Sequence, residues 1–268
     1  MRRHGMKTPT LHPMLVADAG NSAVKFAVVS RPGGRPRLLA RVANEKITAS
    51  RVRSLVRTSG ARTAAAASVV PAVARLLAEA CPHIALIGPD TPLNFRCMTD
   101  RRVTGADRLA NMAEAANRLG GRVIVADFGT AATFDALDAD GSFVGGAIAP
   151  GLRSMGSALA SGTALLPDTA PVAPRRMAGR NTGEALRAGV VGGYTGLVRH
   201  VLDALAGEVF GRRKLRLVFT GGDAAAVARL TGLTAAVDPL WTLRGIAVLG
   251  EAALRESSKQ AGCGADIR

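Results

Sequence analysis

The sequence predicts an α/β protein made of two similar halves, each a mixed sheet flanked by helices. Short apolar segments of strand length alternate along the chain with segments of helical periodicity, which is typical of this class. One pattern also occurs twice: a strand, Asp-x-Gly with a small polar residue, and a second strand, at Asp18–Ser22 and at Asp127–Ala131. A single internal repeat indicates duplication rather than a solenoid, and 268 residues suffice for two cores.

The first half is expected to span residues 14–118, after a disordered basic extension at 1–13. Thr48 is a suitable N-cap for a short helix, and Pro71 suits the first turn of the next one. The expected strands are 14–17, 23–30, 37–42, 63–70 and 84–88, and the expected helices are 48–57, 71–79 and 105–119.

The second half is expected to span residues 119–256, followed by a tail at 257–268. Three prolines and several basic residues predict a loop over residues 166–180. The expected strands are 122–126, 131–137, 143–148 and 215–219, and the expected helices are 151–165, 181–210, 224–230 and 240–255.

Composition excludes several other classes of protein. Hydrophobic residues make up 48% of the chain, which predicts a packed core. No apolar run approaches the roughly 18 residues of a membrane span, and the N-terminus lacks the apolar middle of a signal peptide. The three cysteines, Cys81, Cys97 and Cys263, are widely spaced, which favours reduced thiols in a cytoplasmic protein over a metal or redox motif.

The net charge of +15 would suit a nucleic-acid partner. However, the positive residues are nearly all arginine and are scattered, apart from short clusters such as Arg175-Arg176 and Arg212-Arg213-Lys214. Aromatic residues, which stack on bases, are only 3% of the chain. We therefore expect no nucleic-acid partner, and we expect the positive field to attract acidic small molecules.

The first loop of the repeat has the composition of a phosphate-binding turn. Gly20 allows backbone N–H groups to approach an anion closely, Asn21 and Ser22 add polar groups, and Lys25 adds a positive charge. Asp18 would repel bare phosphate, so its expected role is to hold Mg²⁺ or its water shell. Taken alone, the segment is equally compatible with an ordinary hairpin turn.

The second loop, Asp127–Thr130, is as weak a signal as the first when taken alone. Together, two such loops facing each other could grip a triphosphate from both sides. A third segment, Thr220–Asp223, places two glycines between a strand and a helix, where a flat ligand could lie against the backbone. A plain strand-to-helix turn explains this third segment equally well.

Gly105-Ala106-Asp107-Arg108 stands at the start of an expected helix, and helix N-termini favour anions. Arg108 offers a forked set of donors for a carboxylate or a phosphate. Asp107 could orient a hydroxyl and accept its proton, since phosphoryl transfer relies mainly on positioning and electrostatics. A helix-start Asp beside a solvated Arg is the competing interpretation. Gly145–Gly151 could line a substrate site or simply turn the chain.

Taken in their order along the chain, and with Asn181-Thr182 between Gly145–Gly151 and Thr220–Asp223, these segments resemble the type III pantothenate kinases, over about Met14 to Glu251. Ser68–Pro71 fits the first half of that family. The resemblance implies an actin/hexokinase-like fold with two ribonuclease-H-like halves. It also implies ATP-dependent phosphorylation of pantothenate to 4'-phosphopantothenate, the first step toward coenzyme A, in a homodimer whose substrate site lies at the interface.

The resemblance also implies roles for individual residues. Asp107 takes the position of the proton acceptor, Asp127 that of the ligand to K⁺ or NH₄⁺, and Thr130 that of an ATP contact. The remaining ATP-binding positions are Asp18, Ala19, Gly20, Asn21, Ser22, Ala23, Val24, Lys25, Gly221 and Gly222, and the pantothenate-binding positions are Gly105, Ala106, Asp107, Arg108 and Thr182.

The sequence departs from the family in one stretch before Gly105. Where the family carries Tyr and then Asn-Pro, this chain has Met98, Asp100 and Arg101, and Ser22 replaces the usual Thr. The change at Met98 leaves open a related kinase that acts on another hydroxyl compound. A non-catalytic regulatory protein of the same fold is the third alternative, against which Asp18, Asp107 and Asp127 are all present.

Overall fold

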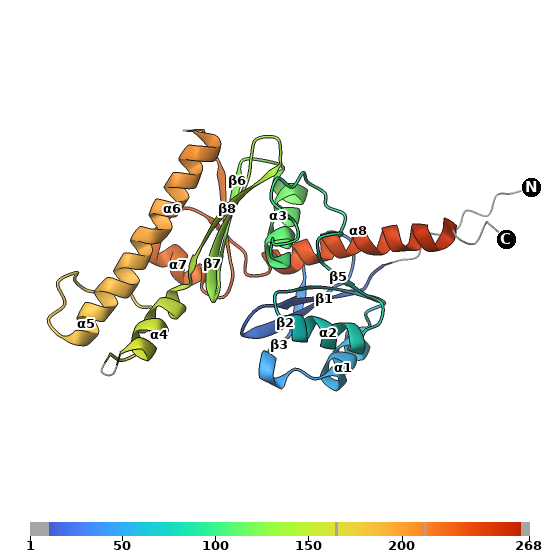
Figure 1. Cartoon of the computed structure of the whole chain (residues 1–268), viewed down its shortest axis with the longest axis horizontal. Coiled ribbons are helices and arrows are strands. Elements are labelled where there is room, and N and C mark those ends of the chain that lie inside the picture. The colour runs from blue at the N-terminus through green and yellow to red at the C-terminus, as the bar shows by residue number, and fades with distance from the viewer. Residues whose placement is uncertain (1–10, 164–165, 212, 264–268) are drawn as a thin grey trace, which may run out of the picture. The chain divides into compact units, whose positions relative to one another are not determined.

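The computed structural model describes residues 11–163, 166–211 and 213–263, which form two compact units. One unit contains the described residues up to Pro92 together with those from Ile246 onward, and the other is Leu93–Gly245. Figure 1 labels their helices and strands. Among the described residues, no helix has the length and apolar character needed to cross a membrane.

The first unit is built on a five-stranded sheet in the order β3-β2-β1-β4-β5. Strands β1, β2 and β3 form an antiparallel meander, and β4 and β5 extend it in parallel from β1. The elements are β1 (Met14–Ala19), β2 (Ala23–Val29), β3 (Arg37–Ala43), the 3₁₀ turn η1 (Asn44–Lys46), α1 (Ala49–Ser59), β4 (Thr63–Ser68), α2 (Pro71–Ala80) and β5 (Ile84–Leu86).

Both predicted helix starts of the first unit are confirmed. The hydroxyl of Thr48 accepts a hydrogen bond from Arg51 N, and Pro71 is the first residue of α2. Apolar side chains of α1 and α2 pack with Val24, Phe26 and neighbouring strand residues in one core. The opposite face of the sheet contacts α8 (Trp241–Cys263), where a Cβ on Gly250 would lie 2.3 Å from Ala65 Cβ.

The second unit repeats this topology with the strand order β10-β9-β6-β7-β8. Here β6, β7 and β8 form the antiparallel meander, and β9 and β10 extend it in parallel from β6. The predicted duplication into two ribonuclease-H-like halves is therefore confirmed. The strands are β6 (Val123–Phe128), β7 (Ala131–Leu137), β8 (Phe143–Pro150), β9 (Arg216–Thr220) and β10 (Ala236–Val237).

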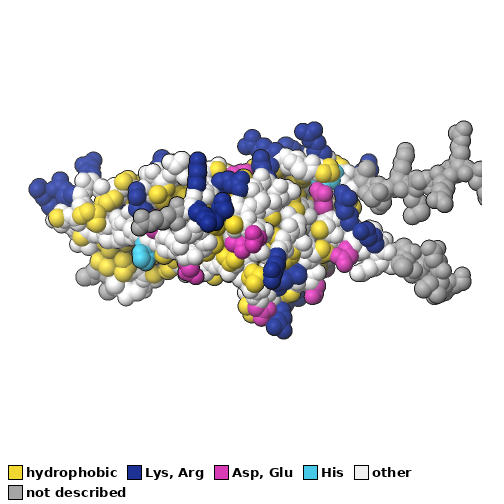
Figure 2. All heavy atoms as spheres, turned by 90° about the horizontal axis from the view of Figure 1, so that it is seen from above, with side chains coloured by type: hydrophobic (Ala, Val, Ile, Leu, Met, Phe, Trp, Pro, Cys, Tyr) yellow, Lys and Arg dark blue, Asp and Glu magenta, His cyan; other side chains and the backbone are white. Residues whose placement is uncertain are grey.

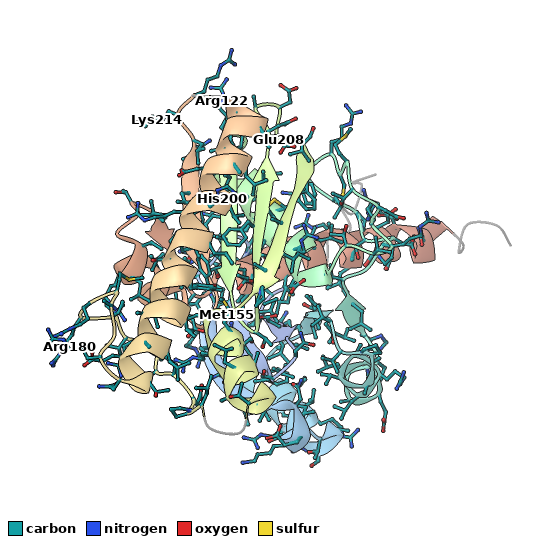
Figure 3. All side chains as sticks on the ribbon, turned by 60° about the vertical axis from the view of Figure 1, so that its left-hand side comes forward. Arg122, Met155, Arg180, His200, Glu208 and Lys214 are labelled. Carbon is teal, nitrogen blue, oxygen red and sulfur yellow. The ribbon has the colours of Figure 1, made fainter. Side chains whose placement is uncertain are left out.

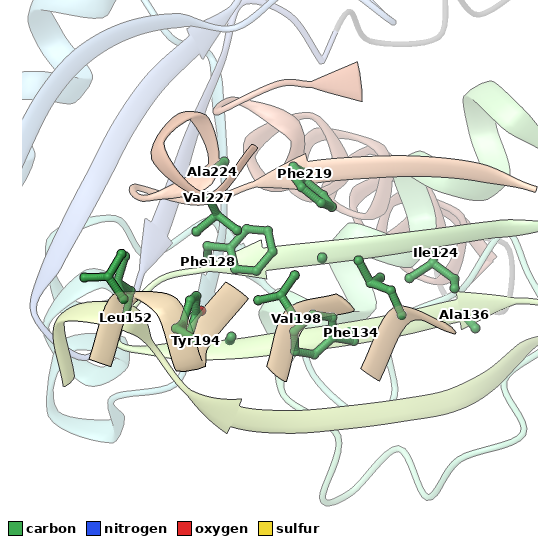
Figure 4. Close-up of a cluster of buried hydrophobic side chains, with 14 of the residues drawn as sticks. Ile124, Phe128, Phe134, Ala136, Leu152, Tyr194, Val198, Phe219, Ala224 and Val227 are labelled. Carbon is green, nitrogen blue, oxygen red and sulfur yellow. The ribbon is translucent and has the colours of Figure 1, made fainter. Parts of the chain in front are cut away.

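Helices cover both faces of the second sheet. On one face, Phe128, Phe134 and Phe219 form edge-to-face ring pairs against Tyr194 and Val198 (Figure 4). On the other face, α3 contributes to a second cluster of buried apolar side chains. The helical elements are α3 (Ala106–Leu119), α4 (Leu152–Gly162), α5 (Thr182–Arg187), a π-helical segment (Ala188–Gly192), α6 (Gly193–Phe210) and α7 (Ala224–Thr231).

Several boundaries differ from those expected from the sequence. The helix expected at 181–210 is continuous but contains the π-helical segment, whereas the one expected at 151–165 ends at Gly162. The last helix, α8, runs to Cys263 and so takes in much of the stretch expected as a tail. Helix α3, which was expected in the first half, packs on β6 and β7 of the second unit.

The N-terminal extension expected at 1–13 lies mostly outside the described residues. Where it is described, it contacts the first unit: His12 Nδ1 lies 2.9 Å from the Val29 carbonyl oxygen, and His12 Nε2 lies 2.9 Å from Glu251 Oε1. The hydroxyl of Thr63 donates to the Leu11 carbonyl. Figure 2 shows Lys and Arg side chains spread over one face with acidic residues among them, as the scattered sequence positions predict.

Candidate functional site

The loop between β1 and β2 is held in shape by one asparagine. Gly20 N donates to the Ala23 carbonyl at 3.2 Å. Asn44 Nδ2, from the η1 turn, donates to the carbonyls of Gly20 at 2.9 Å and Asn21 at 2.8 Å, while Asn44 N donates to the Ser22 carbonyl. In the sequence, Asn44 is only a polar residue just after an expected strand, so no motif marks it.

In the segment Asp18–Lys25, some side chains are buried in the core and others face each other across the strands β1 and β2. Ala19 and Val24 are buried in the first core, so only their backbone groups could contact a ligand. Asp18 and Lys25 stand opposite each other in the β1–β2 register, with Lys25 Nζ 3.5 Å from Asp18 Oδ2. The positive charge expected to face a phosphate is therefore partly balanced by the carboxylate expected to hold Mg²⁺.

The equivalent loop of the second unit is held by the start of α4. Gly129 N donates to the Ala131 carbonyl at 3.0 Å, which parallels the bond made by Gly20 in the first unit. The Thr130 carbonyl accepts from Gly151 N at 3.0 Å and from Ser154 Oγ at 2.6 Å. A Cβ on Gly151 would lie 2.0 Å from the Gly129 carbonyl oxygen, so this close approach requires glycine. The last residue of the expected Gly145–Gly151 segment thus positions the loop.

The Thr-Gly-Gly-Asp turn after β9 lies against Asp127. Gly221 has a φ of +93°, and a Cβ there would lie 2.4 Å from Asp127 Oδ1. Asp223 N donates to the Phe128 carbonyl, and Arg153 Nε donates to Asp223 Oδ1 at 3.0 Å. The structure therefore brings Asp127, Thr130 and Gly221 together at one end of the second sheet.

Asp127 has the surroundings of a ligand for a large cation. Its Oδ2 accepts from Asn111 Nδ2 at 3.1 Å and from Thr242 Oγ1 at 3.5 Å. Its Oδ1 faces the space that a Cβ on Gly221 would fill. One carboxylate oxygen with backbone carbonyls nearby, such as that of Phe128, suits a weakly bound monovalent ion with oxygen ligands. The residues present therefore fit the expected ion.

The carboxylate of Asp107 lies at the first turn of α3. Asp107 Oδ1 accepts from Arg108 N at 2.8 Å. Burial, together with the negative charge of Asp127, raises the pKa of Asp107 above its ordinary value despite the opposing effect of Arg108. A carboxylate with a raised pKa is a better proton acceptor, as a general base requires.

The guanidinium of Arg108 is held by Asp135, a residue outside the sequence motifs. Arg108 Nε donates to Asp135 Oδ1 at 2.9 Å and to Oδ2 at 3.2 Å, and its Cζ lies 5.6 Å from the ring centre of Phe143. Asp135 is completely buried, and burial raises its pKa to about 6. The available signal was an acidic residue in the middle of the otherwise uncharged strand Ala131–Leu137.

Thr182 lies apart from Asp107 in the structure, whereas Met98 lies beside Phe143, whose ring contacts Arg108. Thr182 is exposed at the start of α5, where Asn181 Oδ1 accepts from Glu184 N. Figures 1 and 3 show α5 beside α4 and away from α3. Met98, at the position of the family tyrosine, is 55% exposed, and its N donates to the Phe143 carbonyl at the edge of β8.

A separate hollow of about 510 Å³ lies at the other end of the second sheet. Its lining residues are Gly121, Arg122, Ala139, Lys214, Leu215 and Arg216. Figure 3 shows Arg122 and Lys214 at the opposite end of the unit from Met155 of α4. This recess is therefore distinct from the loops at Asp127 and Thr130.

The duplicated ribonuclease-H-like topology, with an Asp-x-Gly loop after the first strand of each sheet, places the protein in the actin/hexokinase-like class. A solved structure with this fold, a conserved protein from Campylobacter jejuni described as a Baf family transcriptional activator, matches with a TM-score of 0.56 at 20% identity. The match covers 91% of this chain and 99% of that one.

Within that class, the chain belongs to the type III pantothenate kinase family. The family model matches residues 14–204. The type III pantothenate kinase of Akkermansia muciniphila is 38% identical over 243 residues, covering 87% of this chain and 96% of that protein. The one from Methylacidiphilum infernorum is 32% identical over 248 residues, covering 92% and 91%.

Proposed function

We propose that the protein transfers the γ-phosphoryl group of ATP to the primary hydroxyl of pantothenate, giving 4'-phosphopantothenate for coenzyme A biosynthesis. Family membership supports the reaction. The observation that carries the mechanism is the carboxylate of Asp107, fixed at the start of α3 with a raised pKa.

On this proposal, ATP is bound by backbone and side-chain groups of the two Asp-x-Gly loops. The Asp18–Lys25 segment binds the phosphates, with Asn44 keeping Gly20 and Asn21 in place. Thr130 contacts ATP beside the N-terminus of α4, and helix N-termini favour anions. Gly221 and Gly222 present bare backbone to the adenosine. Asp18 would hold Mg²⁺ through its water shell, and the ion would offset phosphate charge.

Asp107 then performs the proton transfer. It accepts a hydrogen bond from the attacking hydroxyl, orients its oxygen toward the γ-phosphorus, and takes the proton as the new P–O bond forms and the bond to ADP breaks. The proton subsequently passes to solvent. Because positioning and charge dominate phosphoryl transfer, a carboxylate base suffices. Gly105, Ala106 and Arg108 hold the rest of pantothenate next to this oxygen.

Asp127 is the proposed ligand of K⁺ or NH₄⁺. Such an ion would offset the negative charge that Asp127 places near Asp107 and near the phosphates. The contacts of Asp127 with Asn111 and Thr242 fix one carboxylate oxygen and leave the other directed at Gly221. The ion would therefore act as a fixed positive charge.

We also propose that a second copy of the chain completes the pantothenate site. Thr182 lies away from α3 of the same chain, so the Thr182 that contacts pantothenate would come from the second copy. A dimer could cover exposed apolar side chains on the edge strand β8 and in the segment before α3, which are Met98, Val103, Val144 and Ile148. We place the dimer in the cytoplasm, where ATP is available.

ADP release from ATP and Mg²⁺ in potassium buffer, with and without pantothenate, tests the function. Strong pantothenate-dependent release is the expected result. Release with another hydroxyl compound in a substrate panel, but not with pantothenate, would favour the related kinase indicated by Met98. ATP binding without any release would favour a non-catalytic protein of the same fold.

A further inference from the structure

The position of Asp135 is unusual for a purely structural residue. It lies in the middle of β7 with no exposed surface, and its neighbours Phe134 and Ala136 point into the apolar core of the other face. Burying an ion pair seldom stabilises a protein more than well-packed apolar groups of the same size would. An aspartate at this position therefore points to a role in placing its partner, Arg108.

Asp135 engages one particular edge of the Arg108 guanidinium. Nε donates to both carboxylate oxygens, at 2.9 and 3.2 Å, and Nη2 donates to Oδ1 at 2.5 Å. A guanidinium carries five N–H donors in a rigid plane, so this side-on contact leaves the Nη1 edge for another acceptor. Phe143, with its ring centre 5.6 Å from Cζ, further restricts the plane.

We propose that Asp135 is a positioning residue that directs the Nη1 edge of Arg108 toward the carboxylate of pantothenate. This inference rests on the proposed function. Because the charge of Arg108 is already balanced by Asp135, its recognition of a second carboxylate depends on directed hydrogen bonds rather than on net charge. Binding of this kind selects an acceptor by its geometry, which is a means of choosing one small acid among many.

The test compares pantothenate and ATP kinetics in Asp135→Asn, Arg108→Gln and the double variant. We expect Asp135→Asn to raise the pantothenate KM about tenfold or more, with a smaller change in kcat and an unchanged ATP KM. If Asp135 acts through Arg108, the double variant should have the same pantothenate KM as Arg108→Gln. Additive effects, or an unchanged pantothenate KM in Asp135→Asn, would overturn the proposal.

Two further variants separate positioning from folding. Glu114 is another buried carboxylate of the same unit; it lies on α3 and is 3% exposed. Glu114→Gln should therefore leave the pantothenate KM unchanged. Arg108→Lys keeps the charge but loses the fork, so it should raise the pantothenate KM as Asp135→Asn does, and it decides the question if Asp135→Asn does not fold. A wild-type protein that releases no ADP with pantothenate would instead refute the proposed function.

Discussion

Gly105 lies so close to the carboxylate of Asp107 that a Cβ at Gly105 would be 2.4 Å from Asp107 Oδ1. The backbone of Gly105 has a φ of −57°, which other residues also adopt. The glycine is therefore required by the neighbouring carboxylate and not by the backbone. Any side chain at this position would displace Asp107 from the place where Arg108 N holds it.

Gly105→Ala should fold normally and lose about 10- to 100-fold in kcat, because a displaced base no longer faces the hydroxyl. Steady-state kinetics and a thermal melt measure the two effects. Gly207→Ala is the matched control, since it lies in α6 with no atom within 4 Å of an added Cβ. Equal activity of the two variants would show that Gly105 does not protect the position of Asp107.

Asp107→Asn should lower kcat by about 10²- to 10⁴-fold, the usual contribution of a general base. It should not lower the melting temperature, because it removes a buried charge whose raised pKa shows that ionisation is unfavourable there. Single-turnover kinetics and calorimetry are the measurements. Full activity in the variant would exclude Asp107 as the base.

Asp127 should make activity depend on the monovalent cation. Rates in K⁺ or NH₄⁺ should exceed those in Na⁺ at equal ionic strength, because a single carboxylate oxygen with carbonyls nearby suits a large, weakly hydrated ion. In Asp127→Asn the difference between K⁺ and Na⁺ should disappear. Equal wild-type rates in the two salts would contradict the assignment.

Asn44→Ala should raise the ATP KM several-fold and leave the pantothenate KM unchanged. The change removes the two bonds that hold the Gly20 and Asn21 carbonyls, each worth about 1 kcal/mol. Thr48→Ala, which removes the N-cap of α1 in the same unit, should cost about as much stability without changing the ATP KM. An ATP KM that rises equally in both would indicate general destabilisation.

Glu114 should make stability depend on pH. Burial raises its pKa from 4.5 to about 7, although Arg118 and Arg244 oppose the shift. A carboxyl with a raised pKa in the folded state binds more protons there than in the unfolded state, so the free energy of unfolding falls as pH rises from about 4.5 to about 7. The difference between the urea midpoints at pH 5 and pH 8 should be smaller in Glu114→Gln than in the wild type. It should not vanish, because Asp135 contributes in the same direction. Identical pH dependence in the variant and the wild type would contradict this.

The duplicated fold was predictable because both strand–loop–strand copies are local in sequence. Which sheet a helix covers is not local, so α3 was expected in the first half although it packs on β6 and β7. Strand β10, at Ala236–Val237, is too short to produce a pattern. The end of α8 lacks apolar periodicity, because the residues at 255–260 are polar and exposed.

Within the candidate site, sequence reasoning singled out residues that belong to motifs and did not single out the residues that contact them. Asp107 and Asp127 stand in recognisable contexts beside glycines. Asn44 and Asp135 contact Gly20 and Arg108, which are 24 and 27 positions distant. Such pairings depend on strand register and helix packing, which become visible only in the folded chain.

Because of helix α8, the last segment of the first unit is synthesised after the whole of the second unit. The helix begins in the second unit, where a Cβ on Gly245 would overlap the Ala110 carbonyl, and from Ile246 it belongs to the first. The first unit is thus discontinuous in sequence: its five strands leave the ribosome before the segment that packs on Ala65 has been translated. This sheet must therefore wait with one face uncovered until α8 has been synthesised, and exposed apolar surface of this kind favours aggregation of a nascent chain.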